Sequence, residues 1–252
     1  MGNIISESST RIKTGLALIS AFLLMGYIDN LYFTWFMLGL VMFFAFKEAM
    51  DLFDIYDERM YIVAILTWIL ALYYPQPQEL VFLVGVVFAS YLAYTKELNK
   101  KVFLPLMYPL APVLFLFAIY ANFGIEYLLW LVVVVSGADI GAYFVGKSIG
   151  KTSFCATSPN KTLEGVMGGI LIAGIAGTFI APDSLGFMVA FIISFATAGA
   201  SVFGDLFESY LKREADVKDS GDILPGHGGM LDRSDGFLFA GIVMYITLGL
   251  VA

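Results

Sequence analysis

The sequence predicts an all-α protein, a polytopic integral membrane bundle of about nine transmembrane helices. Two properties of the 252-residue chain indicate this class: 60% of the residues are hydrophobic, and only 14% are charged. A water-soluble domain of this size needs more polar surface, so much of the chain is expected to have lipid as its solvent. The third observation is that long apolar stretches recur between short polar breaks along the whole chain.

Nine apolar segments account for the predicted helices, and several are shorter than the roughly 20 residues that cross a bilayer untilted. The segments are 14–28, 31–46, 60–74, 79–95, 103–120, 126–146, 165–181, 185–204 and 235–252. We expect one membrane domain over 1–252. Its N-terminal and middle spans occupy 1–125, and its catalytic part occupies 126–252 with polar loops at 147–164 and 205–233. Close glycines from Gly165 to Gly177 indicate tight helix packing, or alternatively the wall of a substrate groove.

The basic residues predict the orientation of the chain. If the chain crosses the membrane nine times, every Lys and Arg lies in a polar break on the same side of the membrane. The polar breaks on the opposite side contain no Lys or Arg. The basic residues are Arg11, Lys13, Lys47, Arg59, Lys96, Lys100, Lys101, Lys147, Lys151, Lys161, Lys212, Arg213, Lys218 and Arg233. Because Lys and Arg mark the cytoplasmic side, the N-terminus is expected inside and the C-terminus outside. Both long polar loops then face the cytoplasm.

The segment 204–235 differs from the rest of the chain because it combines many acids with Lys, Arg and the sole histidine, His227. In its middle lies the glycine-rich turn 225–229. Glycines permit positive φ angles and allow backbone N–H groups to approach a bound anion. Interspersed Lys and Arg are expected where a triphosphate is held. The single cysteine, Cys155, excludes an intrachain disulfide and is interpreted as a spectator in a loop.

Carboxylates on both sides of this turn predict a Mg²⁺ site. Asp205 precedes the turn, and Asp232 and Asp235 follow it, three residues apart at the start of the last apolar segment. Mg²⁺ takes oxygen ligands and commonly bridges to substrate phosphates. The alternative for Asp232 and Asp235 is an acidic first turn that complements the helix dipole.

Two upstream features point to the same site. Asp139 lies inside the segment 126–146, where an ionised group costs about 2.5–3.5 kcal/mol or more and usually faces a functional cavity. A helix–helix hydrogen bond is the alternative. Ser158, Asn160 and Lys161 offer phosphate contacts in the loop 147–164. His227 is interpreted as a phosphate contact or a loop-structuring residue rather than a general base.

The motifs of this region resemble the signature of the CDP-diacylglycerol synthases (phosphatidate cytidylyltransferases). They are Ser209-x-Leu211-Lys212-Arg213, Lys218-Asp219-x-Gly221 and Leu224-Pro225-x-His227-Gly228-Gly229-Met230-x-Asp232-Arg233-x-Asp235. Supporting matches are Thr10-Arg11-Ile12-Lys13-Thr14-Gly15, Asp139-Ile140-Gly141-Ala142-Tyr143, Ser158-Pro159-Asn160-Lys161-Thr162-x-Glu164-Gly165 and Gly204-Asp205-Leu206-x-Glu208-Ser209. Ser234 departs from the family, which usually has an apolar residue there.

This resemblance implies a membrane enzyme, expected to be a homodimer in the bacterial inner membrane, that makes CDP-diacylglycerol and pyrophosphate from CTP and phosphatidate. It implies dependence on Mg²⁺, with Asp205 and Asp232 as ligands, and leaves room for a monovalent cation such as K⁺. No nucleic-acid partner is expected. The catalytic candidates are Asp205, Asp232, Lys212, Arg213 and Arg233, and the metal candidates are Asp205, Asp232 and Asp235. The substrate-binding candidates are Asp139, Ser158, Asn160, Lys161, Ser209, Lys218, Asp219, His227, Gly228 and Gly229.

Three other functions would each account for part of this pattern. A CTP-dependent polyprenol or phytol kinase would share the membrane setting and the cytosolic nucleotide site. A CDP-alcohol phosphotransferase fits Asp232-x-x-Asp235-Gly236, but the apolar run that follows lacks the further aspartates that this family requires. A transporter or scaffold would explain Asp139, but not the dense loop of Gly, His, Asp and Arg, and no inverted repeat is visible in the sequence.

Overall fold

The computed structural model describes residues 2–96 and 100–251, with side chains described over 12–96 and 101–251. The side chains of Arg11 and Lys100, which the charge pattern assigns to the cytoplasmic side, are not among those described, and neither is the side chain of Thr10 in the N-terminal motif. Within these ranges the chain is helical, and it has two isolated β-bridges but no β-strand.

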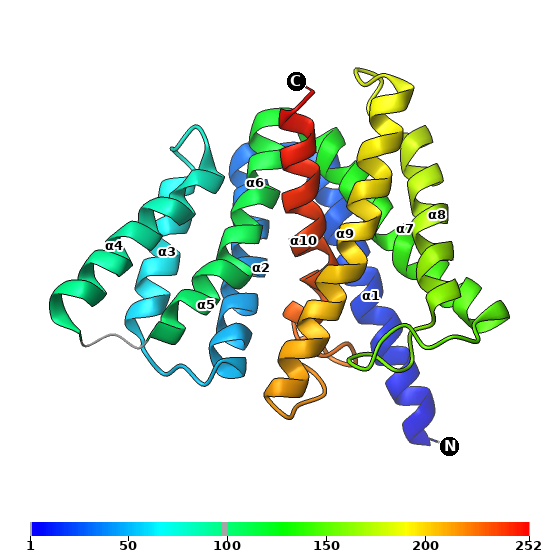
Figure 1. Cartoon of the computed structure of the whole chain (residues 1–252), viewed down its shortest axis with the longest axis horizontal. Coiled ribbons are helices and arrows are strands. Elements are labelled where there is room, and N and C mark those ends of the chain that lie inside the picture. Colours follow the sequence, from blue (N-terminus) through cyan, green and yellow to red (C-terminus); the bar gives the residue numbers. More distant parts are fainter. Residues whose placement is uncertain (1, 97–99, 252) are drawn as a thin grey trace. The chain divides into compact units, whose positions relative to one another are not determined.

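The helices follow one another along the chain with short connections (Figure 1). Their bounds are α1 Gly2–Ile28, α2 Leu31–Leu52, α3 Arg59–Ala71, η1 Pro77–Glu79, α4 Leu80–Thr95, η2 Lys100–Val102, α5 Phe103–Pro105, η3 Leu106–Leu110, α6 Ala111–Phe123, α7 Ile125–Ile149, α8 Leu163–Ile180, α9 Phe187–Glu214 and α10 Leu231–Gly249. Each of the nine apolar segments overlaps a helical stretch over most of its described residues, which confirms the all-α class.

Six helical stretches of the described chain are long and apolar enough to cross a membrane. They are Leu31–Leu52, Pro77–Thr95, Phe103–Phe123, Ile125–Ile149, Leu163–Ile180 and Phe187–Glu214. Two further apolar helices, Ile12–Ile28 and Arg59–Ala71, are shorter. The chain is therefore a polytopic membrane protein, whereas the total of nine crossings and the orientation of the termini stay predictions.

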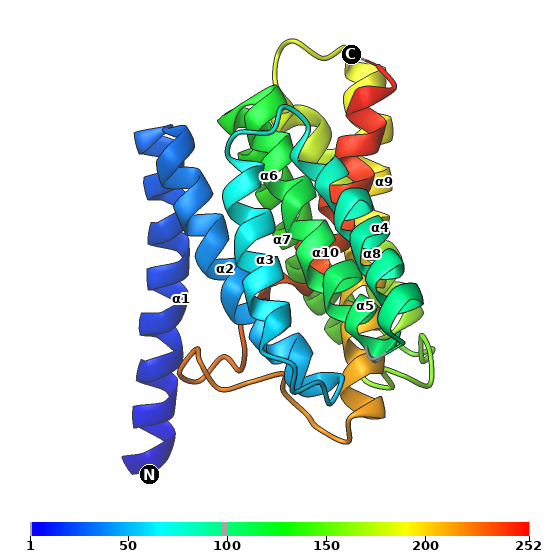
Figure 2. The same cartoon turned by 90° about the vertical axis from the view of Figure 1, so that its left-hand side faces the viewer.

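The residues form two compact units, of which the first comprises Met1–Ala121 and Val217–Ser234. In this unit α1 and α2 form a helical hairpin (Figure 2). The indole rings of Trp35 and Trp68 stack with their centroids 6.2 Å apart, and Trp35 Nε1 donates to the Trp68 carbonyl at 2.9 Å. Phe117 packs on Trp68 from α6. These aromatic contacts fix α2 and α3, and α2 carries a residue of the candidate site.

The second unit comprises Asn122–Asp216 and Asp235–Ala252. Its helices α7, α8 and α9 pack on one another (Figure 1). A Cβ on Gly141 of α7 would lie 3.0 Å from the Cα of Gly169 in α8, so the two backbones are nearly in contact. Trp130 Nε1 also donates to the Gly177 carbonyl at 2.8 Å. The glycines from Gly165 to Gly177 thus serve tight helix packing.

The polar loop predicted at 205–233 is shorter in the structure, because helices extend into both of its ends. Residues 205–214 belong to α9, and α10 begins at Leu231. The charged residues from Asp205 onward do not end α9. Lys212 and Arg213 lie in its last turn, where basic side chains complement the helix dipole. Asp205 and Asp232 therefore stand on helices, and the connecting loop is confined to 215–230.

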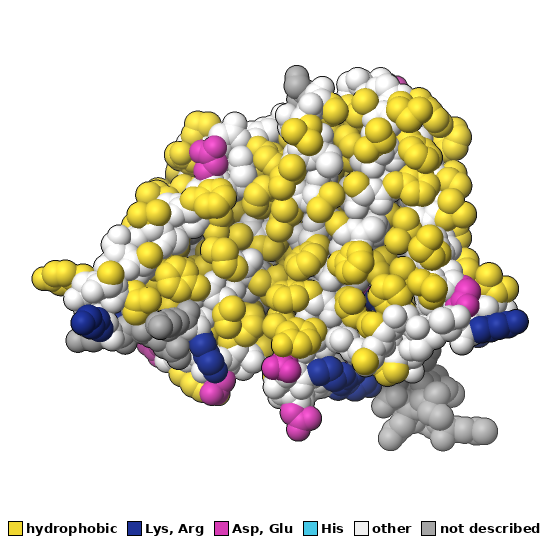
Figure 3. Space-filling model, in the orientation of Figure 1, with side chains coloured by type: hydrophobic (Ala, Val, Ile, Leu, Met, Phe, Trp, Pro, Cys, Tyr) yellow, Lys and Arg dark blue, Asp and Glu magenta, His cyan; other side chains and the backbone are white. Residues whose placement is uncertain are grey.

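Large hydrophobic side chains cover the outward faces of the helices (Figure 3). Phe82 of α4, Phe179 of α8 and Phe187 of α9 are each more than 60% exposed. Exposure on this scale is unfavourable in water but normal against lipid tails.

Candidate active site

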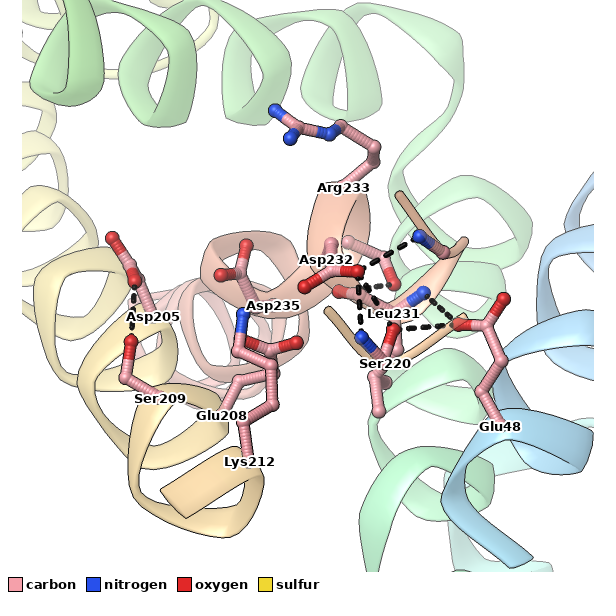
Figure 4. A network of polar contacts seen from close by, with 12 residues as sticks. Glu48, Asp205, Glu208, Ser209, Lys212, Ser220, Leu231, Asp232, Arg233 and Asp235 are labelled. Atoms are coloured by element: carbon pink, nitrogen blue, oxygen red, sulfur yellow. Dashed lines mark hydrogen bonds and ion pairs between the residues drawn. The ribbon is translucent and has the colours of Figure 1, made fainter. Parts of the chain in front are cut away.

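The side chain that holds the 215–230 loop is Glu48, near the end of α2. Its Oε1 accepts the Met230 N–H at 2.8 Å, and its Oε2 accepts the Leu231 N–H at 2.7 Å (Figure 4). The Ser220 hydroxyl lies 2.9 Å from Oε2. Glu48 is only 6% exposed, so its charge depends on these donors. Because the first N–H groups of a helix lack intrahelical partners, a carboxylate is favourable at the start of α10.

Asp232, in the first turn of α10, accepts hydrogen bonds from two backbone N–H groups of the same loop. Its Oδ2 accepts the Ser220 N–H at 2.9 Å and the Gly229 N–H at 2.8 Å. The Ser220 hydroxyl lies 3.0 Å from the same oxygen. Gly228 has a positive φ of 82°, and a Cβ there would come within 2.7 Å of Asp232 Oδ2. Gly229 of the turn thus donates its N–H to an anion, as the sequence indicates for the glycines, but this anion is a carboxylate of the protein.

A polar pocket of about 540 Å³ opens in this loop. Its lining is Lys218, Asp219, Gly221, Asp222, Leu224, Gly226, His227, Gly228 and Arg233. Arg233 Nε donates to the His227 carbonyl at 2.9 Å, which fixes the backbone of the turn. His227 Nδ1 is buried and has no hydrogen-bond partner among the described residues. Five of the sequence-predicted site residues therefore line one pocket: Lys218, Asp219, His227, Gly228 and Arg233.

The N-terminal motif reaches the same loop. Thr14 Oγ1 of α1 donates to the Pro225 carbonyl at 2.9 Å. A Cβ on Gly15 would lie 3.8 Å from His227 Nε2. Helix α1 thus supports the glycine-rich turn, which gives the Thr14-Gly15 part of the motif a structural role.

A second group of predicted residues comes together on α9 and the loop before α8, within the second unit. Lys161 forms an ion pair with Asp205. The Ser209 hydroxyl lies 3.4 Å from Asp205 Oδ1 (Figure 4). The backbone of α9 approaches that of α10 here, since a Cβ on Gly204 would collide with the Asp235 carbonyl oxygen. The charges of Asp205 and Asp139 both act on the Asp235 carboxyl group. This part of the site is therefore acidic, with Lys161 as a counter-ion.

Glu208 and Lys212 form a further ion pair one turn along α9. The Glu208 side chain is fully buried, and Lys212 is largely buried as well. Breaking such a pair on one side costs about 3–5 kcal/mol, because the other charge stays buried. Arg213, the neighbouring candidate, is exposed at the end of the helix.

The loop that carries Ser158, Asn160 and Lys161 is closed by Glu164. Its carboxylate accepts the Lys151 N–H at 3.1 Å, and the Thr152 hydroxyl donates to it at 2.8 Å. Phe154 N–H also donates to the Lys161 carbonyl at 2.8 Å. These bonds explain the Glu164 of the sequence motif, since they hold the base of the loop from which Lys161 reaches Asp205.

The predicted metal set is divided between the units. Asp232 belongs to the first unit, and Asp205 and Asp235 belong to the second. In the part of the chain that the structure describes, no three His, Cys, Asp or Glu side chains form a ready-made metal cluster. A Mg²⁺ ion held by one or two carboxylates, with water and substrate phosphate as its other ligands, needs no such cluster. Each of these carboxylates is an oxygen donor of the kind that Mg²⁺ takes, and their membership in one site stays a prediction.

Comparison with known proteins bears on the identity of this site. The model of the cytidylyltransferase family matches residues 9–251. A phosphatidate cytidylyltransferase of Helicobacter pylori strain J99 is 43% identical over 96% of this chain and 92% of its own length. The chain belongs to the cytidylyltransferase family.

Other members are similar over shorter stretches. The phosphatidate cytidylyltransferase of Thermotoga maritima is 39% identical over 68% of each chain. That of Bacillus subtilis is 46% identical over 51% of this chain and 49% of its own. Membership in the family makes this chain a nucleotidyltransferase, as its signature residues predict.

Sequence reasoning missed two residues of the site, Glu48 and Ser220. Glu48 lies in a stretch of mixed charges after the second apolar segment, and nothing there distinguishes it from Asp51 or Asp54. Ser220 occupies an unassigned position between Asp219 and Gly221 of the motif. The structure separates the two acids of α2, because Glu48 is buried and Asp51 is exposed.

Proposed function

We propose that this protein transfers the cytidylyl group of CTP to phosphatidate, giving CDP-diacylglycerol and pyrophosphate for phospholipid synthesis. The observation that carries the proposal is the likeness to the Helicobacter pylori phosphatidate cytidylyltransferase over nearly the whole chain. The polar loop 215–230 with its pocket, set in an otherwise apolar helical protein, agrees with a reaction between a nucleotide and a lipid.

We propose that the protein lies in the bacterial inner membrane, and the charge pattern supports an orientation with the N-terminus and the site on the cytoplasmic side. CTP then enters from water, and phosphatidate enters sideways from the bilayer. We further propose a homodimer, as the family resemblance implies.

The reaction is an in-line displacement at the α-phosphorus of CTP. A phosphate oxygen of phosphatidate forms a bond to this phosphorus, and the bond to the oxygen bridging to the β-phosphate breaks. Pyrophosphate leaves with the bonding electron pair. Phosphate monoesters are largely dianionic near pH 7, so the nucleophile needs no general base. Because the phosphatidate oxygen attacks the α-phosphorus directly, the reaction involves no covalent enzyme intermediate.

The residues of the chain hold the reacting groups and balance their charge. Lys161, Lys212, Arg213, Lys218 and Arg233 are the proposed phosphate contacts, because cationic donors strengthen as charge develops on phosphoryl oxygens. The residues proposed to orient the substrates are Ser158, Asn160, Ser209, Asp219, His227, Gly228 and Gly229. Asp139 acts beside the Asp205 and Asp235 carboxylates. Asp205, Asp232 and Asp235 would hold Mg²⁺. When bound, Mg²⁺ supplies positive charge that stabilises the phosphoryl oxygens.

The experiment determines which phosphate of CTP is transferred to the lipid. Purified protein in detergent receives Mg²⁺, phosphatidate and CTP labelled at either the α- or the γ-phosphate. We expect α-label in the lipid and γ-label in pyrophosphate. Label from the γ-phosphate in the lipid would identify a kinase instead. Absence of CTP-dependent pyrophosphate release with phosphatidate, when other lipid phosphates are also inactive, would refute the proposal.

A further inference from the structure

The contacts of Glu48 extend beyond the start of α10. Its carboxylate also meets the Ser220 hydroxyl, which lies between Glu48 Oε2 at 2.9 Å and Asp232 Oδ2 at 3.0 Å. The Ser220 N–H donates to the same oxygen of Asp232. A continuous polar path therefore runs from α2 through Ser220 to Asp232 in the first turn of α10.

At two positions of the signature, Gly221 and Gly229, the Glu48 side chain leaves no space for a Cβ atom. A Cβ on Gly221 would lie 2.8 Å from Glu48 Oε1 and 3.0 Å from its Cγ. A Cβ on Gly229 would collide with Glu48 Oε2 and with the Ser220 hydroxyl. The loop is wrapped closely around this carboxylate, so its shape depends on Glu48 being present and correctly placed.

Both oxygens of the Glu48 carboxylate accept a backbone N–H, one from Met230 and one from Leu231. A glutamine can offer only one acceptor oxygen, and its NH₂ group would then face a backbone donor. Glutamine therefore cannot reproduce the contacts of Glu48, although its shape is nearly identical.

We infer that Glu48 is a positioning residue, which acts through Ser220 and the first residues of α10 to hold the Asp232 carboxylate in its working orientation. The inference rests on the proposed function for its kinetic consequence. The expected consequence is selective: weaker use of Mg²⁺ and slower turnover, in a protein whose helices remain assembled.

The test compares Glu48→Gln with Asp51→Asn, which removes one acidic group from an exposed position on the same helix. Hydrogen exchange read by mass spectrometry reports on the peptide that spans 217–235, with a peptide from α8 as internal reference. Steady-state rates are measured over a range of Mg²⁺ concentrations. For Glu48→Gln we expect faster exchange in 217–235 only, a Mg²⁺ concentration for half-maximal rate raised at least fivefold, and a maximal rate at least tenfold lower. Asp51→Asn should match wild type.

Ser220→Ala keeps the test decisive if Glu48→Gln does not fold. It removes only the hydroxyl between the two carboxylates, and we expect a smaller change of the same kind. Wild-type exchange and Mg²⁺ dependence in Ser220→Ala, or in a folded Glu48→Gln, would overturn the inference. A loss of activity with unchanged Mg²⁺ dependence and faster exchange in α8 as well would indicate general destabilisation and would also overturn it. If wild type itself lacks the CTP reaction, the proposed function fails, whereas the exchange measurement still decides whether Glu48 holds the loop.

Discussion

Lys161 is paired with Asp205, which joins the loop before α8 to the acidic turn of α9. The two side chains are each a little over one quarter exposed, at 28% and 27%. A pair with this access to water adds only about 0–1 kcal/mol to stability. We propose that Lys161 acts toward substrate instead, with its ammonium group moving from Asp205 to an incoming phosphate.

We therefore predict that Lys161→Met lowers turnover about 100-fold, the usual scale for losing one charge-stabilising donor, with little effect on thermal stability. Lys151→Met is the control, because Lys151 is exposed in the same loop and its backbone rather than its side chain contacts Glu164. Rates of pyrophosphate release and melting curves in detergent measure the two effects. Equal loss in both variants would show that the loop needs only positive charge.

Asp232→Asn separates the charge of this residue from its hydrogen bonds. The bonds from Ser220 and Gly229 all reach Oδ2, so the amide oxygen of asparagine can accept them, while the negative charge is lost. We expect activity to fall about 100-fold or more, with wild-type hydrogen exchange in 217–235. Asp216→Asn should be silent, because Asp216 has a left-handed φ of 55° that asparagine adopts readily. A fully active Asp232→Asn would remove Asp232 from the metal set.

Removal of divalent metal should abolish the reaction. We expect no pyrophosphate release after EDTA treatment and dialysis, and full recovery with Mg²⁺, because the carboxylates proposed as ligands prefer a hard cation. K⁺ is titrated separately at fixed Mg²⁺ to test the second cation. Unimpaired activity in the metal-free protein would refute the Mg²⁺ proposal without affecting the assignment to the family.

Gly169→Ala tests the packing of α7 on α8. The added methyl group would collide with the Ala138 carbonyl and lie 2.9 Å from the Cβ of Ala142. Overpacking of this kind costs about 1–3 kcal/mol, so we expect a lower melting temperature in detergent. Gly199→Ala in α9 is the matched control, because no atom lies within 4 Å of its added Cβ. Equal stability of the two variants would contradict the close approach at Gly169.

The helices were predictable because hydrophobicity along a membrane chain is a local property. The ends of α9 and α10 were not, since the charged residues around Asp205 and Asp232 were interpreted as loop although they continue helices. Asp205, Lys161 and Asp232 stay predictions from their motifs, and the structure adds the ion pair between Lys161 and Asp205. Glu48 was missed because its partners lie 172 to 183 residues away, and one sequence contains no signal that pairs such distant positions.

The separation of Glu48 from Leu231 also has a consequence for biosynthesis. At about 5–20 residues per second, the ribosome needs on the order of ten to forty seconds to make the 183 residues between them. During this interval α2 carries an acid whose native donors do not yet exist. The loop around Glu48 therefore closes only after residues 220–231 have been synthesised, late in translation.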